Sequence, residues 1–245
     1  MEGDLLHIKS LETNLPHFGH NLDNLNGKIS FDDLFLQTTN SHINVASVDA
    51  LTATAQTTNA HIVGNFTTTK ELTLTTTNGL ISANVEMRNA VSSRIPTKLT
   101  MSTSNGPLTS NIDLITDSPD HKGGAYIVKA RTTNDPLTIG FPTSPSATHL
   151  TLSGKTSNAP ATVNLHSRYE GAFHLQTSSS SSMFVHYKEG AVDPEGLGRD
   201  RVMDITRRTR GALEGTTTWG RNSVAKKWSD VEVKTTNGPV SLAVM

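Results

Sequence analysis

The stretch that decides the fold runs Leu72-Thr-Leu-Thr-Thr-Thr-Asn78-Gly79-Leu-Ile-Ser-Ala-Asn-Val85. Apolar residues lie six and four positions before Asn78, and three, five and seven positions after it. Alternation with a period of two is typical of β-strands that bury one face, and Thr and the branched aliphatic residues suit strands. Between the two runs, Thr-Thr-Asn-Gly predicts a tight corner, because Asn and Gly reach left-handed conformations at little cost.

The same frame recurs along almost the whole chain. Its copies centre on Asn40, Asn59, Asn78, Asn105, Asn134, Asn158 and Asn237, and a degenerate copy at 173–179 has Ser in place of Asn. The first two steps are 19 residues each, close to the 20–30 residues of many solenoid repeats. Prolines also stand two positions after four of these Asn residues, where a hairpin needs an amide donor that Pro lacks; they are Pro107, Pro136, Pro160 and Pro239.

These observations predict an all-β, single-domain β-solenoid of Thr-Thr-Asn-Gly coils over residues 1–245. Residues 1–33 are expected to form an irregular N-terminal cap, because terminal repeats are usually atypical. Residues 188–230 interrupt the frame and are expected to form an irregular excursion. The alternative is an antiparallel β-sandwich or meander in which each Asn-Gly closes a hairpin.

The repeated unit resembles the repeat of an adhesin-like family, solenoid-like domains of unknown function found in bacteria and fungi. The run from Gly215 to Gly220, followed by Ser229-Asp-Val-Glu-Val-Lys-Thr-Thr-Asn-Gly-Pro-Val-Ser-Leu242, resembles the closing coils of the fungal members. The resemblance covers about residues 30–245. It implies a β-solenoid and surface display, and it supplies no catalytic residues.

Composition limits the function classes. The chain has no cysteine, which excludes disulfides, thiol catalysis and thiolate metal sites, and its net charge of −1 gives no reason to expect nucleic acid as a partner. No apolar run is long enough for a transmembrane helix, and we expect no cofactor. The start shows no signal-peptide core, so the sequence predicts an intracellular protein, or a cell-surface or extracellular one if an N-terminal segment has been removed.

Most of the regular polar features have a structural interpretation. The stacked Asn column is expected to be a hydrogen-bonded ladder. His42 and His61 occupy the same position in adjacent coils, but a metal site needs at least three ligands, so they are interpreted as solvated neighbours. Asp113, Asp117, Asp120 and His121 resemble a paired-carboxylate site for glycoside hydrolysis, but loop carboxylates beside Ser-Pro and Gly-Gly are interpreted as turn formers.

Two groups of residues are candidate binding residues. Arg131 and Lys155 occupy the same outward position in adjacent coils, where a basic residue can meet an acidic sugar or simply limit edge aggregation. The excursion contains both tryptophans and a basic run, a combination enriched at binding hot spots; its candidates are Trp219, Trp228, Arg207, Arg208 and Arg210. These tryptophans can equally plug the open end of the solenoid.

The pattern favours a non-catalytic, adhesin-like binding or scaffold protein that recognises a carbohydrate or another cell-surface ligand. A polysaccharide lyase or hydrolase built on a β-helix is the alternative from another class. The third hypothesis is a self-assembling structural protein, an end-to-end homo-oligomer that stacks through its open ends.

Overall fold

The computed structural model describes residues 5–90, 92–93, 95–178, 181–188, 190–220 and 229–245. The regular elements of these residues are all strands: β1 (Leu6–Asn14), β2 (His20–Asn24), β3 (Ile29–Gln37), β4 (Ile43–Gln56), β5 (Ile62–Thr75), β6 (Ile81–Asn89), β7 (Thr97–Ser102), β8 (Leu108–Thr116), β9 (Ala125–Arg131), β10 (Leu137–Thr143), β11 (His149–Lys155), β12 (Ala161–Leu165), β13 (Gly171–Gln176), β14 (Met183–Tyr187), β15 (Arg201–Arg208), β16 (Ala212–Trp219), β17 (Asp230–Lys234) and β18 (Val240–Val244). They form one mixed sheet of 18 strands, so the predicted all-β class is confirmed. The sheet is not closed, because β1 pairs only with β3 and β15 only with β16.

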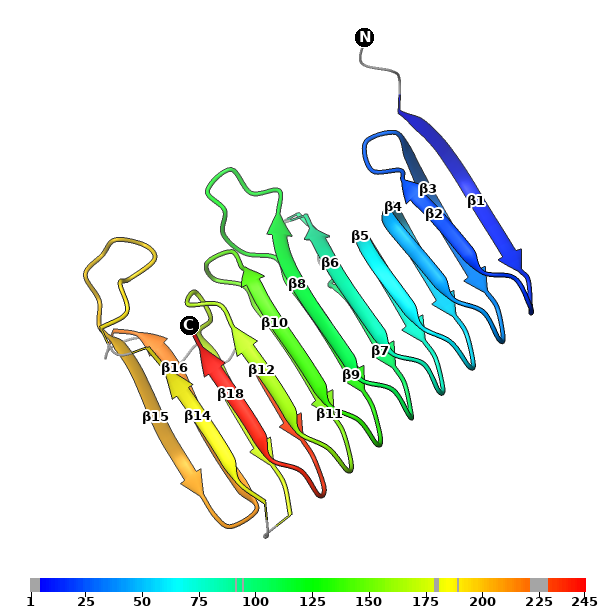
Figure 1. Ribbon diagram of the computed structural model, residues 1–245. Helices are drawn as coiled ribbons and strands as arrows, with labels where there is room; N and C mark the ends of the chain where they lie inside the picture. Colours follow the sequence, from blue (N-terminus) through cyan, green and yellow to red (C-terminus); the bar gives the residue numbers. More distant parts are fainter. Residues whose placement is uncertain (1–4, 91, 94, 179–180, 189, 221–228) are drawn as a thin grey trace.

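The strands pair in two columns of mostly parallel ladders, and successive turns of the chain lie side by side (Figure 1). The first column runs β1, β3, β4, β5, β7, β9, β11, β17, β13, β16 and β15. The second column runs β2, β4, β5, β6, β8, β10, β12, β18 and β14. Strands β4 and β5 are long and contribute one half to each column.

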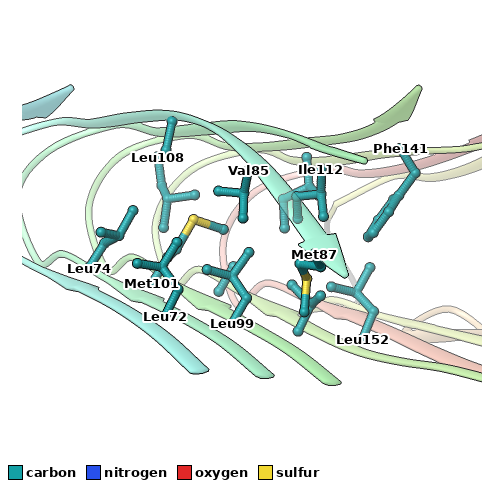
Figure 2. Close-up of a cluster of buried hydrophobic side chains, with 14 of the residues drawn as sticks. Leu72, Leu74, Val85, Met87, Leu99, Met101, Leu108, Ile112, Phe141 and Leu152 are labelled. Carbon is teal, nitrogen blue, oxygen red and sulfur yellow. The ribbon is translucent and has the colours of Figure 1, made fainter. Parts of the chain in front are cut away.

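The core lies between the columns. Figure 2 shows Leu72 and Leu99 of the first column directed toward Val85 and Ile112 of the second. Seven residues at the apolar positions of the frame are at most 2% exposed; they are Leu72, Leu74, Ile81, Val85, Leu99, Ile112 and Leu165. Their register is also conserved from turn to turn, since Ile62 pairs with Ile81 and Ile81 with Leu108. Apolar residues at the same frame position therefore stack on one another in successive turns, which buries a continuous apolar strip.

Each corner is held by the Thr and Asn of the repeated unit. A buried Thr hydroxyl donates, at 2.8–3.2 Å, to the carbonyl that follows the Asn position in a neighbouring turn, and this holds for Thr57, Thr76, Thr103, Thr132, Thr156, Thr177 and Thr235. The Asn side chains form the predicted ladder, with amide-to-amide hydrogen bonds of 2.6–2.8 Å through Asn40, Asn59, Asn78, Asn105, Asn134, Asn158 and Asn237. Polar groups at the corners thus find partners in the neighbouring turn.

The hairpin alternative is wrong at these corners. Strand β5 pairs parallel with β7 and strand β6 parallel with β8, so Asn78-Gly79 joins the two columns instead of closing a hairpin. The expected left-handed backbone is also wrong at Gly79, because no positive φ occurs there. Gly79 is needed for another reason: an added Cβ would lie 1.7 Å from the carbonyl oxygen of Ala60 in the adjacent turn.

The order of the turns differs from the order of the sequence. The C-terminal strands β17 and β18 lie between the pair β11/β12 and the pair β13/β14 (Figure 1). The chain therefore leaves the stack after β12, forms β13 to β16, and returns to fill the place beside β11 and β12. Strand β17 is held on both sides, by β11 and by β13.

The segments expected to be irregular contain strands. Within residues 1–33, β1 pairs in parallel register with β3 over residues 6–14, although most of its side chains are exposed. Within residues 188–230, β15 and β16 form an antiparallel pair, and β16 continues antiparallel onto β13. In the part of the chain that the structure describes, these are the only antiparallel pairings. No helix of the described residues is long and apolar enough to cross a membrane.

Candidate functional site

Three cations stand in register on the outward face of the first column. Arg131 ends β9, Lys155 ends β11 and Lys234 ends β17. Arg131 pairs with Lys155, and Lys155 pairs with Lys234, so the three side chains occupy adjacent strands at the same height. Neighbouring strands in a sheet lie about 4.8 Å apart. We call these three residues the cationic row.

The row is bounded by neutral polar residues and has one further cation beside it. Ser102 precedes Arg131 in the same register, and Gln176 follows Lys234. Lys129 lies two residues before Arg131 on the same face and is exposed. The arrangement is therefore a short cationic strip on an otherwise uncharged polar register row.

One carboxylate lies within the strip. Lys155 Nζ is 2.7 Å from a carboxylate oxygen of Glu232, which also accepts a hydrogen bond from the Ser153 hydroxyl at 3.2 Å. The hydrogen bond from Lys155, with the positive charge of Lys234 nearby, holds the pKa of the Glu232 carboxyl below its usual value. Within the described part of the chain, no ion pair involves Arg131, Lys129 or Lys234. The single carboxylate of Glu232 thus lies among four cationic side chains, those of Lys129, Arg131, Lys155 and Lys234.

The sequence pattern indicates two members of the row, Arg131 and Lys155, but not the third. In sequence order the neighbour of Lys155 would be Gln176, and Lys234 would come after it. The structure instead places Lys234 directly beside Lys155, because β17 lies between β11 and β13. Lys129 was missed as well, although its two-residue spacing from Arg131 puts both on one strand face.

Trp219, the first excursion candidate, is buried. It is 2% exposed, and its indole nitrogen donates to the Ser167 carbonyl at 2.9 Å. The Arg201 guanidinium lies 5.0 Å from the ring centroid, within cation–π range. These contacts fasten β16 to the 166–170 connection and leave no indole surface for a ligand.

The other excursion candidates do not gather around Trp219. Arg207 forms an ion pair with Glu214 of the neighbouring strand β16 at 3.0 Å. Arg208 ends β15 and Arg210 follows it, and both are exposed. Trp228 lies outside the described residues.

The two histidines at matching positions of adjacent turns have structural partners. The rings of His42 and His61 stack, as their register predicts, with centroids 5.5 Å apart. Each ring also hydrogen-bonds an Asn side chain at 3.2 Å, His42 that of Asn21 and His61 that of Asn44. No group of three His, Cys, Asp or Glu residues that could hold a metal occurs among the described residues.

Comparisons with protein-family models, with curated proteins and with solved structures return no match to this chain.

Chemically, the cationic row is suited to binding an extended anion. Its side chains are solvent-accessible to different degrees, since Arg131 is exposed and Lys155 and Lys234 are half-buried. Their spacing matches a line of charges rather than a single anion, because each cation comes from a separate strand. The row offers charge and hydrogen-bond donors, but it has no nucleophile paired with a base, as covalent catalysis would need.

Proposed function

We propose that this chain is a non-catalytic, adhesin-like β-solenoid that binds acidic polysaccharide along the cationic row. The solenoid interpretation is supported by parallel ladders that keep one register through seven corners. Such a stack is a stiff scaffold, because each turn is bonded to its neighbours through backbone, Thr and Asn groups. The proposed ligand runs across the strands, along the axis on which the turns stack.

The observation that carries the proposal is the in-register alignment of three cations. Like charges placed directly opposite each other on adjacent strands destabilise a sheet. Lys155 is compensated by Glu232, but no carboxylate is paired with Arg131 or Lys234 among the described residues. A linear polyanion would supply the missing negative charges, and it would relieve the repulsion as it binds.

The surroundings of the row favour a sugar polymer over a nucleic acid. Proteins that bind single-stranded nucleic acid use aromatic side chains as stacking platforms, and the register row that contains the cations has none. It consists instead of Gln37, Gln56, Thr75, Ser102, Arg131, Lys155, Lys234 and Gln176. Hydroxyl and amide groups of this kind can donate to and accept from sugar hydroxyls. Carboxylates or sulfates repeated along a polysaccharide would meet the cations.

Binding to polygalacturonate, with neutral dextran as the comparison, tests the proposal by isothermal titration calorimetry. The triple variant Arg131→Gln/Lys155→Gln/Lys234→Gln is expected to lose the interaction, and Gln is tolerated because Gln37 and Gln56 occupy the same register row. The matched control Lys9→Gln/Lys70→Gln/Lys188→Gln removes the same charge from exposed positions elsewhere. It should bind as the wild type does.

Three results would contradict the proposal. The first is equal loss of binding in the triple variant and its control, which would indicate a net-charge effect. The second is tighter binding of an oligothymidylate than of polygalacturonate, which would identify a nucleic-acid surface. The third is release of unsaturated uronate fragments during incubation, which would favour the lyase alternative. The triple variant should unfold at nearly the same temperature as the wild type, since it loses both the repulsion and the exposed Lys155–Glu232 ion pair.

End-to-end assembly is a second candidate function, supported by the first strand of the stack. Among the described residues, strand β1 pairs on one edge only, and it exposes Leu6 and Leu11. An unpaired edge with apolar side chains is a template for pairing with another chain. Light scattering at increasing protein concentration tests this: oligomers should form with the wild type and be lost in Leu6→Lys/Leu11→Lys. A wild type that stays monomeric would exclude this candidate.

A further inference from the structure

Four connections meet at the edge of the stack opposite the Asn ladder and enclose an open cleft. They are the β8–β9 connection (117–124), the β10–β11 connection (144–148), the β12–β13 connection (166–170) and residues 193–199 of the β14–β15 connection. The cleft has a volume of about 290 Å³ and is lined by residues of all four, among them His121, Ser146, Arg168 and Leu197. A second hollow of about 90 Å³ also has His121 and Arg168 in its wall. This volume is at the lower end of small-molecule sites.

Arg168 in this cleft is a cation with unused donors. A guanidinium has five N–H donors. Among the described residues, that of Arg168 makes one hydrogen bond, from Nη1 to the Ser144 carbonyl at 3.2 Å. Its Nε is buried without a partner, and no carboxylate forms an ion pair with it. The Nη2 donors also have no partner among the described residues, and they are not buried, so they remain available to a ligand in the cleft.

The acidic side chains around the cleft already have partners. Glu195 accepts from Arg199 at 3.2 Å and lies 3.9 Å from Lys122. The Asp120 carboxylate accepts from the Ser118 hydroxyl. Glu170 accepts from the Trp219 backbone amide at 2.6 Å. The charge pattern therefore leaves Arg168 as the cation that lacks an anion.

The cleft is preorganised. The loop at 117–124 is bonded to the loop at 144–148, since Gly123 N–H donates to the Ser146 carbonyl at 2.8 Å. Residues 193–199 are held together by Arg199, whose guanidinium donates to both carboxylate oxygens of Asp193 at 2.8 and 2.9 Å. The two residues other than glycine with positive φ in the described chain are His121 and Ala147, one in each of the first two loops. Unusual backbone conformations of this kind cluster at functional sites.

We propose that this cleft binds the carboxylate of a small acidic ligand of about one sugar in size, with Arg168 as the anchoring residue. The planar guanidinium fork matches a carboxylate, which can accept two parallel hydrogen bonds. A singly charged carboxylate fits better than a phosphate dianion, because Asp120 and Glu195 also line the cleft and would repel the second charge. The site is separate from the cationic row, so it does not depend on the function proposed above.

The test is titration of the full chain with sodium glucuronate, followed by NMR or calorimetry, with glucose as the neutral comparison. The wild type should bind glucuronate and not glucose. Arg168→Gln should weaken binding roughly ten- to a hundredfold, the loss expected for a charged hydrogen-bonded pair. Arg168→Lys should recover part of it, since the charge remains and the fork is lost.

A second variant guards against misfolding of the Arg168 variants. Leu197→Glu, at a residue 67% exposed in the lining of the cleft, adds a competing carboxylate to the same cleft as Arg168, and it should also abolish binding. Its control is Val192→Glu, at a residue 86% exposed in the same connection that does not line the cleft.

Three results would overturn the inference. They are failure of the wild type to bind glucuronate, equal binding by Leu197→Glu and the wild type, and equal binding of glucose and glucuronate. The triple variant of the cationic row distinguishes two sources of the carboxylate, a free acid and the end of a polysaccharide chain. If that variant binds glucuronate but not polygalacturonate, the cleft takes free acids; if it still binds short uronate oligomers better than the monomer, the cleft takes chain ends.

Discussion

Replacing Thr103 by Val tests whether the buried Thr of each corner holds neighbouring turns together. Thr103 is 2% exposed, and its hydroxyl donates to the Gly79 carbonyl at 2.9 Å. Val has nearly the same shape but no hydroxyl, so the packing is retained and the hydrogen bond is lost. The Gly79 carbonyl has no other hydrogen-bond donor among the described residues. It would be left without a partner inside the corner.

Leaving one buried partner unsatisfied costs about 1–3 kcal/mol. In a domain of this size, 1 kcal/mol shifts the melting temperature by roughly 2–4 °C, so Thr103→Val should lower it by roughly 2–12 °C. The control is Thr100→Val, at an outward position of β7, the strand that ends just before Thr103. The Thr100 hydroxyl makes no hydrogen bond to a described residue, and surface changes of this kind stay within about 0.5 kcal/mol. Differential scanning calorimetry measures both. Equal melting temperatures for the two variants would refute the role assigned to the corner Thr.

Three further predictions concern the C-terminal part of the chain. Trp219→Ala should destabilise the protein by about 3–5 kcal/mol, the usual range for a buried aromatic residue. Polygalacturonate binding should stay intact at a temperature where the variant is folded. Loss of binding by the folded variant would show that Trp219 belongs to the site. Glu232→Gln should tighten polygalacturonate binding near pH 7, because the low pKa of Glu232 keeps its carboxylate charged there, and weaker binding would contradict the assigned electrostatics. The pair Thr151→Cys/Asp230→Cys should form a disulfide on mild oxidation, since the two are register partners in β11 and β17, at a strand spacing that a disulfide can span. Thr151→Cys/Ala172→Cys should form no disulfide. A disulfide is detected as a mobility shift on non-reducing gels. A disulfide in the second pair and none in the first would show that β13 and not β17 lies beside β11.

Much of the fold could be predicted because its determinants are local. The period-two pattern around Asn78 specifies which side chains face inward, and burial of Leu72 and Ile81 follows from it directly. The Asn ladder was predictable for the same reason, since each Asn occupies one position in a repeated corner. The role of Gly79 was not, because it depends on how closely the Ala60 carbonyl of the next turn approaches.

The order of the turns could not be read from the sequence. Every regular turn presents the same apolar strip to its neighbour, so the frame alone does not predict that β17 lies between β11 and β13 rather than beyond β13. In the structure β16 occupies the outer edge of β13 and β15 the outer edge of β16, so β17 takes the place between β11 and β13. Both candidate sites depend on such long-range placement, since Lys234 is 79 residues from Lys155 and the cleft combines four separate connections.

The affinity for polygalacturonate across a series of NaCl concentrations tests the central claim most directly, with the wild type, Lys234→Gln and the triple variant compared. Neutralised cations release counterions, so the logarithm of the binding constant should fall linearly with the logarithm of the salt concentration. Removing each cation of the row should reduce that slope by roughly one, so the single variant should lose about one and the triple variant about three. Slopes that are the same for all three proteins would contradict the claim that Arg131, Lys155 and Lys234 together contact the polyanion.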